Sequence, residues 1–240
     1  MPVDVLAIAA HPDDVELTCA GTLVTLKRLG RRFGIVDLTR GEMGTRGDAS
    51  QREREAREAA RILGAEFRET LDLGDGGLRQ DRESELLVID LIRRERPRVV
   101  ITSYPEDRHP DHGRAGRLVT DAAYYAGLRK LETRHPAYRP QQTVYFSAAY
   151  VHEPTFVVDV TAAMETRRAA ILAFSSQFHD PTSKEPQTIL SQQSFLQTVE
   201  ARARHFGFLI GVEFGEGFVS RRPPRLDDPV ACFEGFEPGF

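Results

Sequence analysis

The stretch VDVLAIAAHPDDVE, residues 3–16, decides the fold class of this chain. Its first part, residues 3–10, is an apolar run that predicts a buried strand, and residues 34–38 (GIVDL) and 99–102 (VVIT) repeat the pattern. The amphipathic stretches that predict helices lie between these strands, at residues 17–29, 50–63 and 86–94. This alternation predicts an α/β fold, in which a Rossmann-like, doubly wound and mostly parallel sheet carries helices on both faces.

We expect one domain over residues 1–240, in which residues 1–130 form the core and residues 131–240 form a C-terminal α/β extension. No Ser/Gly-rich linker or change of composition separates the two halves. Further strands are predicted at residues 66–70, 143–147 and 155–160, and further helices at residues 162–174 and 189–206. The last twenty residues, RRPPRLDDPVACFEGFEPGF, are rich in Pro and Gly, and we expect them to wrap the surface without regular structure.

The composition excludes several classes of protein. Hydrophobic residues make up 40% and charged residues 28% of the 240 positions, a balance typical of a globular protein and not of a disordered one. The net charge of −4 argues against a nucleic-acid partner. The sequence predicts neither a membrane span nor an export signal, so we expect a cytoplasmic protein. Two cysteines, Cys19 and Cys232, do not make a disulfide framework.

A first cluster of polar residues follows directly on the first predicted strand. The segment AHPDDVE supplies His11, Asp13 and Asp14, and the carboxyl ends of strands border the ligand crevice of a doubly wound sheet. This turn does not resemble a dinucleotide-binding loop, which is rich in glycine, because no glycine occurs before Gly21. One imidazole and two carboxylates are a metal-ligand set, although an Asp at a helix start can also serve only as an N-cap.

A second cluster, RHPDHG at residues 108–113, follows the strand at residues 99–102. It supplies His109, Asp111 and His112, and in a flavodoxin-like winding its strand lies beside the first one. We therefore expect both clusters to face one crevice. A lone histidine in a loop is more often an ordinary surface residue, and this is the interpretation for His135, His152, His179 and His205.

The residue types in the two clusters fit a catalytic metal site. A catalytic zinc takes three protein ligands and leaves a position for water. Two histidines and one carboxylate can fill that ligand set, which leaves one carboxylate as a base and one histidine to stabilise an oxyanion. The same ligand types also admit Fe(II), Co or Mn.

The motifs AHPDDVE and HPDH, with LTRGEMGTRG at residues 38–47 and HFGFLIGVEFGEGF at residues 205–218, resemble the LmbE/PIG-L family of zinc-dependent N-deacetylases. Within that family the chain is similar to the bacillithiol-biosynthesis deacetylases, which act on N-acetylglucosaminyl malate. The resemblance implies that zinc is held by His11, Asp14 and His112. It also implies that Asp13 is the general base, and that His109 stabilises the oxyanion and protonates the leaving amine.

Further residues receive roles from the same resemblance. Asp111 would orient a histidine ligand, and the alternative is a helix N-cap. Arg52 and Asp75 would bind substrate, and their alternatives are a solvated helix face and an ordinary turn. Arg46 and Arg108 flank the clusters on predicted loops, and arginine pairs well with the two carboxylates of malate.

We therefore expect zinc-dependent removal of the acetyl group from an N-acetylglucosaminyl substrate, with N-acetylglucosaminyl malate as the leading one. The alternatives are a deacetylase of diacetylchitobiose or GlcNAc and a non-catalytic, metal-bearing sugar-binding module. A metallophosphatase would need a second metal and more bridging carboxylates than the two clusters offer.

The segment at residues 205–218 also bears on assembly. It carries Phe206, Phe208, Phe214 and Phe218 with little charge, a pattern that suits either the core or a subunit interface. Relatives are often hexamers, so we expect a homo-oligomer, either a hexamer or a trimer.

Overall fold

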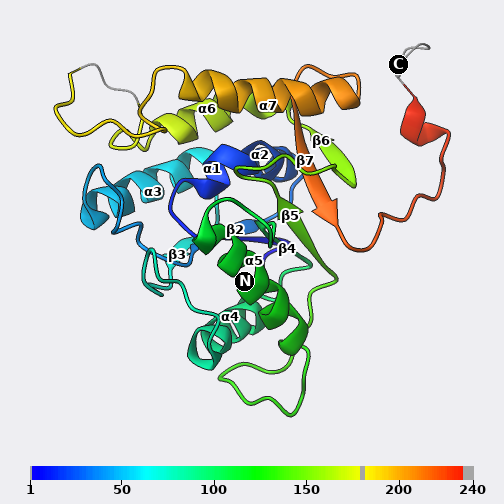
Figure 1. Cartoon of the computed structure of the whole chain (residues 1–240). Helices are drawn as coiled ribbons and strands as arrows, with labels where there is room; N and C mark the ends of the chain where they lie inside the picture. Colours follow the sequence, from blue (N-terminus) through cyan, green and yellow to red (C-terminus); the bar gives the residue numbers. More distant parts are fainter. Residues whose placement is uncertain (1, 179–181, 235–240) are drawn as a thin grey trace.

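The computed structural model describes residues 2–178 and 182–234, and it is built on one seven-stranded sheet (Figure 1). The strand order is β3-β2-β1-β4-β5-β7-β6. The strands are β1 Val5–Ala9, β2 Phe33–Asp37, β3 Arg68–Thr70, β4 Val99–Ser103, β5 Gln142–Phe146, β6 Phe156–Asp159 and β7 Gly215–Ser220. Strands β1 to β5 pair in parallel, whereas β7 runs antiparallel to both β5 and β6. The predicted α/β fold with a mostly parallel sheet is confirmed.

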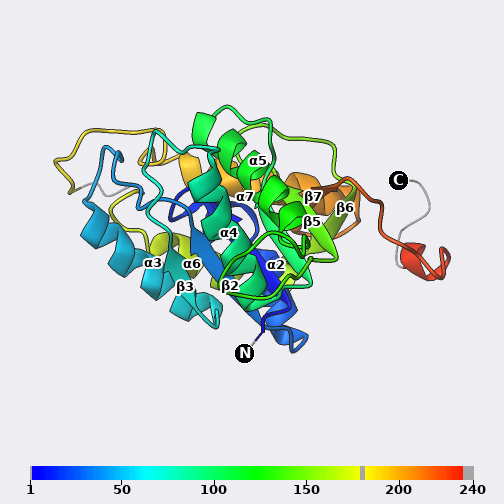
Figure 2. The same cartoon turned by 90° about the horizontal axis from the view of Figure 1, so that it is seen from below.

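Helices cover both faces of this sheet, as Figures 1 and 2 show. The helices are α1 Asp14–Thr18, α2 Ala20–Arg28, α3 Ala49–Leu63, α4 Arg82–Glu95, α5 Pro110–Tyr125, α6 Met164–Leu172 and α7 Phe195–Leu209, with short 3-10 helices η1 Thr161–Ala163 and η2 Ala231–Phe233. Helices α4 and α5 lie on one face, and α1, α2, α3, α6 and α7 lie on the other. None of the described helices is long and apolar enough to cross a membrane.

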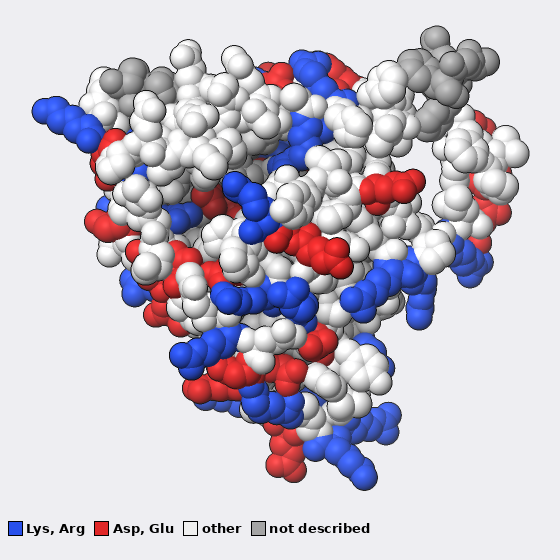
Figure 3. All heavy atoms as spheres, in the orientation of Figure 1, with Lys and Arg blue, Asp and Glu red and all other residues white. Residues whose placement is uncertain are grey.

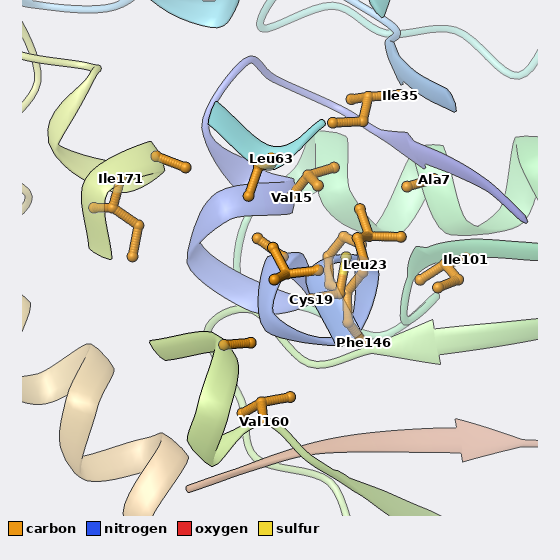
Figure 4. Close-up of a cluster of buried hydrophobic side chains, with 14 of the residues drawn as sticks. Ala7, Val15, Cys19, Leu23, Ile35, Leu63, Ile101, Phe146, Val160 and Ile171 are labelled. Atoms are coloured by element: carbon orange, nitrogen blue, oxygen red, sulfur yellow. The ribbon is translucent and has the colours of Figure 1, made fainter. Parts of the chain in front are cut away.

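Strand β1 shows why its sequence is an unbroken apolar run. Val5, Ala7 and Ala9 point into the core beneath α1, α2 and α3, while Leu6 and Ile8 point into the core beneath α4 and α5. Alternate side chains of a strand leave opposite faces, and here both faces are buried. Figure 4 shows the first of these cores, where side chains of α1 and α2 pack with those of β1 and β4.

Helix α5 was not predicted, although it carries the second cluster. Gly113 and Gly116 lower the helix propensity of this segment. The structure requires glycine there, because a Cβ on Gly116 would lie 2.4 Å from the backbone oxygen of Ser103 in β4. Pro110 at the first helical position and His109 as N-cap set the start of the helix.

The helix predicted at residues 17–29 is in fact two helices, α1 and α2, which meet at Cys19. Residues far along the chain stabilise this break. Arg167 donates to the carbonyl of Glu16 in α1, and the carboxylate of Glu216 accepts the backbone N–H groups of Gly21 and Thr22, in the first turn of α2, at 2.9 and 2.7 Å. A carboxylate at a helix N-terminus satisfies N–H groups that have no partner within the helix.

The segment at residues 205–218 contributes three of its four phenylalanines to the core. It forms the end of α7 and the start of β7, and Phe206, Phe214 and Phe218 are buried within the chain. Only Phe208 of the four is largely exposed. These aromatic residues therefore do not supply the interface argument, and the homo-oligomer stays a prediction.

After β7 the chain leaves the sheet. Residues 221–234 are exposed and, apart from η2, have no regular structure, as predicted. In Figure 1 this segment runs away from the sheet and does not wrap it. The remainder of the predicted tail, residues 235–240, lies outside the described residues. Acidic and basic side chains are interspersed on the face shown in Figure 3.

Candidate metal centre

The two histidine clusters meet at the carboxyl ends of β1 and β4, which are neighbours in the sheet. His11 follows β1, while His109 and His112 lie at the start of α5. The ring centroids of His11 and His109 are 4.8 Å apart, and those of His109 and His112 are 4.7 Å apart. One ring nitrogen from each of these histidines lies within 4.8 Å of the other two. The structure thus brings together all three histidines of the two motifs.

Asp14 lies between His11 and His112, the two histidines with which the family resemblance groups it as a metal ligand. Its Oδ1 lies 3.1 Å from Nε2 of His112, and its Oδ2 lies 3.5 Å from Nδ1 of His11. The backbone N–H of His11 also donates to Oδ2 at 2.9 Å, which fixes the carboxylate. Two imidazole nitrogens and one carboxylate, all largely buried, are a donor set that suits zinc and related divalent metals.

Each of these histidines has a carboxylate on its other ring nitrogen. Nε2 of His11 lies 3.0 Å from Oδ1 of Asp75 and 3.7 Å from Oδ2 of Asp111. Nδ1 of His112 lies 3.1 Å from Oδ1 of Asp107. Carboxylates in this position set the tautomer and ring orientation of metal-ligating histidines.

These carboxylates make the two imidazoles strongly basic. Burial alone lowers the pKa of His11, but hydrogen bonds to Asp111 and two further carboxylates outweigh it and raise that pKa to about 12. Burial likewise lowers the pKa of His112, yet the charge of Asp14 and hydrogen bonds to Asp107 and Asp14 raise it to about 10. A metal that binds here must therefore displace protons.

Asp13 occupies a strained and buried position beside Asp14. As the residue before α1 it has φ of 113°, a positive value that is uncommon for a residue other than glycine. Its Oδ2 lies 3.1 Å from Nη2 of Arg52. Burial raises the pKa of the Asp13 carboxyl to about 7, against the opposing charge of Arg52. A carboxylate with a pKa near neutrality suits a general base.

Arg52 lies on α3 but is not part of a solvated helix face. Its guanidinium donates to the backbone oxygens of Pro12 at 2.6 Å and Gly41 at 3.1 Å, as well as to Asp13. A Cβ on Gly41 would lie 2.3 Å from Nη1 of Arg52, and the φ of Gly41 is +66°. The arginine therefore holds the turn that carries Asp13, and only glycine fits beneath it.

His109 differs from the two neighbouring histidines. Its Nδ1 accepts the backbone N–H of Asp111 at 3.2 Å, so its neutral form carries the proton on Nε2. Burial, with the nearby charge of His112, lowers the pKa of His109. A neutral imidazole with an Nε2–H is a hydrogen-bond donor suited to a developing oxyanion.

The remaining predicted residues fall into different places. Asp75 reaches the cluster, and besides His11 it accepts the N–H of Met43 at 2.8 Å. Asp111 is buried and accepts the N–H of Gly76 at 2.7 Å. It is not an N-cap, because His109 caps α5.

Arg46 and Arg108 do not join the histidines. Arg46 is buried and donates to the backbone oxygen of Ser176 at 2.9 Å, with Glu185 3.7 Å away. Arg108 is exposed and makes no hydrogen bond or ion pair with residues that the structure describes. Asp107, by contrast, contacts His112 but was not predicted as a site residue from the sequence. Nothing in a single sequence distinguishes one Asp in a polar loop from another.

Comparison with known proteins shows which family the chain belongs to and which reaction it catalyses. The family described as GlcNAc-PI de-N-acetylase (PIG-L) matches residues 6–123. The diacetylchitobiose deacetylase of Thermococcus kodakarensis is 31% identical over 227 residues, which cover 89% of this chain and 81% of that protein. A probable N-acetyl-α-D-glucosaminyl L-malate deacetylase 2 of Bacillus anthracis is 27% identical over 72% of this chain and 81% of its own length.

Solved structures of similar proteins support the same family. The conserved protein TT1542 of Thermus thermophilus is 39% identical with a TM-score of 0.86, covering 93% of this chain and 97% of that one. The N,N'-diacetylchitobiose deacetylase of Pyrococcus horikoshii is 29% identical with a TM-score of 0.80, covering 91% and 83%. The chain therefore belongs to the PIG-L family, and it is an N-deacetylase, a hydrolase of linear amides that acts on N-acetylglucosamine-containing substrates.

Proposed function

We propose that this protein is a zinc-dependent deacetylase of a neutral N-acetylglucosamine saccharide, with diacetylchitobiose as the leading substrate. The observation that supports the reaction is the convergence of His11, Asp14 and His112, with Asp13 adjacent and held by Arg52. The diacetylchitobiose deacetylase of T. kodakarensis, at 31% identity, supports the substrate class.

His11, Asp14 and His112 would hold the metal. When bound there, zinc would lower the pKa of water from about 15.7 to about 7 and polarise the acetyl carbonyl. Asp13 takes the proton of the attacking water, and Arg52 keeps its carboxylate in place. The Nε2–H of His109 donates to the oxyanion.

The leaving amine needs a proton, and either Asp13 or His109 could donate it. A neutral His109 is a good hydrogen-bond donor but a weak acid, so we assign this proton to Asp13, which has just received one from water. Protonation lets the nitrogen leave as an amine, and acetate is the other product. Asp75 and Asp111 orient His11 in this scheme.

The arginines favour a neutral substrate over N-acetylglucosaminyl malate. Two of the three arginines expected to contact the substrate are already engaged within the chain, Arg46 by Ser176 and Arg52 by Asp13. Of these three arginines, only Arg108 is exposed and without a hydrogen bond or ion pair to residues that the structure describes. A dianion normally needs more than one charge-assisted contact to offset its desolvation.

A non-catalytic sugar-binding module is the second function that the motifs allow. It has no use for a buried carboxylate held at φ 113° beside a metal-ligand set. Backbone strain of this kind is found where a site needs the side chain in one place. The position of Asp13 therefore supports catalysis.

The test compares acetate release from diacetylchitobiose, GlcNAc and N-acetylglucosaminyl malate by one protein sample whose metal content is measured. We expect the highest kcat/KM with diacetylchitobiose, about one zinc per chain, and loss of activity on chelation that zinc restores. Preference for the malate glycoside would overturn the substrate, and full activity after metal removal would overturn the mechanism.

Arg108→Ala tests the charge of the substrate separately. We expect the ratio of kcat/KM for the malate glycoside to that for diacetylchitobiose to stay unchanged. A selective fall of about tenfold or more for the malate glycoside, the size of one charge-assisted hydrogen bond, would reinstate an anionic substrate.

A further inference from the structure

Asp107 is a buried carboxylate between β4 and α5 that makes no ion pair with an arginine or lysine among the described residues, although the positive charge of Arg202 is close enough to act on it. Its Oδ1 lies 3.1 Å from Nδ1 of His112 and accepts the backbone N–H of His109 at 2.9 Å. Its Oδ2 accepts the backbone N–H of Ala149, in the loop after β5, at 3.0 Å. One side chain thus touches both histidines of the second motif and a loop from the next strand.

We propose that Asp107 is a positioning residue, which fixes the ring of His112 for metal binding and ties the loop at residues 147–152 to it. This inference rests on the proposed function, since it assumes that His112 is a metal ligand.

The chemistry of the His112 ring explains the first part. Nε2 of His112 faces Asp14 at 3.1 Å, and a metal bound between them needs the lone pair of that nitrogen. A neutral imidazole then carries its proton on Nδ1. An ionised carboxylate only accepts hydrogen bonds, so Asp107 stabilises this tautomer and disfavours the other.

The loop at residues 147–152 explains the second part. Besides the Ala149 contact, His152 Nε2 lies 3.0 Å from the backbone oxygen of Glu106, the residue before Asp107. Tyr150 and Val151, between these two contacts, are more than half exposed. The loop is therefore attached to the histidine-bearing segment at two points while its apolar tip stays free.

Asp107→Asn removes the carboxylate with almost no change in volume. An amide has one acceptor oxygen and one donor NH2, so it cannot accept from Ala149, His109 and His112 together. If the NH2 faces His112, it stabilises the tautomer whose Nε2 carries hydrogen. Either orientation leaves a donor facing a donor, within a site that is otherwise unchanged.

The chain offers a matched control in Asp90. Its Oδ1 lies 3.0 Å from Nδ1 of His135 and accepts the backbone N–H of the same residue at 3.1 Å. Asp90 lies on α4 and His135 in the connection between α5 and β5, and neither belongs to the groups that could hold a metal. Asp90→Asn therefore makes the same chemical change in a pair with no role in metal binding.

The experiment measures the zinc Kd of the metal-free wild-type, Asp107→Asn and Asp90→Asn proteins by competition with a chromogenic chelator. The absorption spectrum of each cobalt-loaded protein reports ligand geometry. We expect Asp107→Asn to raise the zinc Kd by about 10- to 100-fold and to alter the cobalt spectrum. Asp90→Asn should leave both unchanged, whatever it does to thermal stability.

Equal zinc Kd values and cobalt spectra for Asp107→Asn and Asp90→Asn would overturn the proposal. If Asp107→Asn does not fold, Asp107→Glu decides, because it keeps the charge but moves the oxygens by one methylene. An unchanged zinc Kd in that variant refutes the positioning role. Failure of the wild-type protein to bind one zinc would instead refute the proposed function, so the two failures are distinct.

Discussion

Replacement of Arg52 separates two roles for the residue most tightly bound to Asp13. The resemblance to the family implies that Arg52 binds substrate, whereas its observed contacts are Asp13, Pro12 and Gly41. We expect Arg52→Lys and Arg52→Ala to lower kcat and to leave KM for diacetylchitobiose nearly unchanged. An interaction that acts on the catalytic base affects the transition state more than substrate binding.

The size of the effect follows from the Asp13–Arg52 contact. Both side chains are 6% exposed and their nearest atoms are 3.1 Å apart. A hydrogen bond between charged groups contributes about 1.5–3 kcal/mol. Since each 1.36 kcal/mol is about tenfold in rate, Arg52→Ala should lower kcat about ten- to hundredfold. Arg52→Lys keeps the charge but lacks the planar guanidinium that reaches three acceptors, so its kcat should lie between the kcat of the wild type and that of Arg52→Ala.

The assay is steady-state acetate release on metal-saturated protein, with zinc content measured for every variant. Arg57→Ala is the control, because Arg57 lies on the same helix, is 68% exposed and pairs only with Glu53 among the described residues. It should behave as wild type. A rise in KM at constant kcat in Arg52→Lys would refute the reasoning and return Arg52 to a substrate-binding role.

Three further predictions follow from the site and its support. Asp13→Asn should keep its zinc and lose about two to four powers of ten in kcat, the usual range for a general base. Zinc content is measured on the assayed sample, and loss of the metal from this variant would contradict the assignment of Asp13 as the base. Asp14→Asn and His112→Ala should lose zinc and activity together, and either one retaining stoichiometric zinc would remove it from the ligand set. Arg68→Met leaves the buried carboxylates of Glu16 and Asp37 without their cation and should lower the free energy of unfolding by about 3–5 kcal/mol, measured by urea denaturation. A loss of less than about 1 kcal/mol, the size expected of an exposed ion pair, would contradict a stabilising role for Arg68 between these two carboxylates.

The sequence predicted the sheet and the meeting of the two motifs for one physical reason. Strands buried on both faces must be apolar throughout, so β1, β2 and β4 stand out as short runs. Parallel strands end at the same edge, which places His11 beside His112 without any knowledge of side-chain contacts. Both inferences use only local patterns and a general rule of topology.

What the sequence did not predict depends on contacts between distant residues. The break between α1 and α2 is held by Arg167 and Glu216, which lie 151 and 195 residues along the chain from the groups they bind. The place of Arg46 depends on Ser176, 130 residues along the chain. Asp107 gains its importance only because the loop after β5 comes back to it. Nothing in the local sequence around these residues distinguishes them from solvated polar residues.

The arginines show that a compositional signal needs the structure before it can be assigned to a substrate. Lys27, Lys130 and Lys184 are the only lysines among 32 basic residues, and this excess of arginine invites the inference of an anionic substrate. In the structure, however, several buried arginines bind backbone carbonyls of the chain itself. Arg93 donates to the carbonyls of Ala126, Leu128 and Leu131. Arg167 and Arg202 both donate to the carbonyl of Leu17 at the end of α1.

A guanidinium suits this internal use better than an ammonium. Its planar fork reaches several carbonyls at once and is more weakly hydrated, so it is less costly to bury. Arg52 does the same at the turn that carries Asp13, and Arg46 does so at Ser176. Arginines that satisfy loop carbonyls are not free to recruit a dianion. The abundance of arginine is therefore no evidence by itself for an anionic substrate, and it is compatible with the neutral saccharide that we propose.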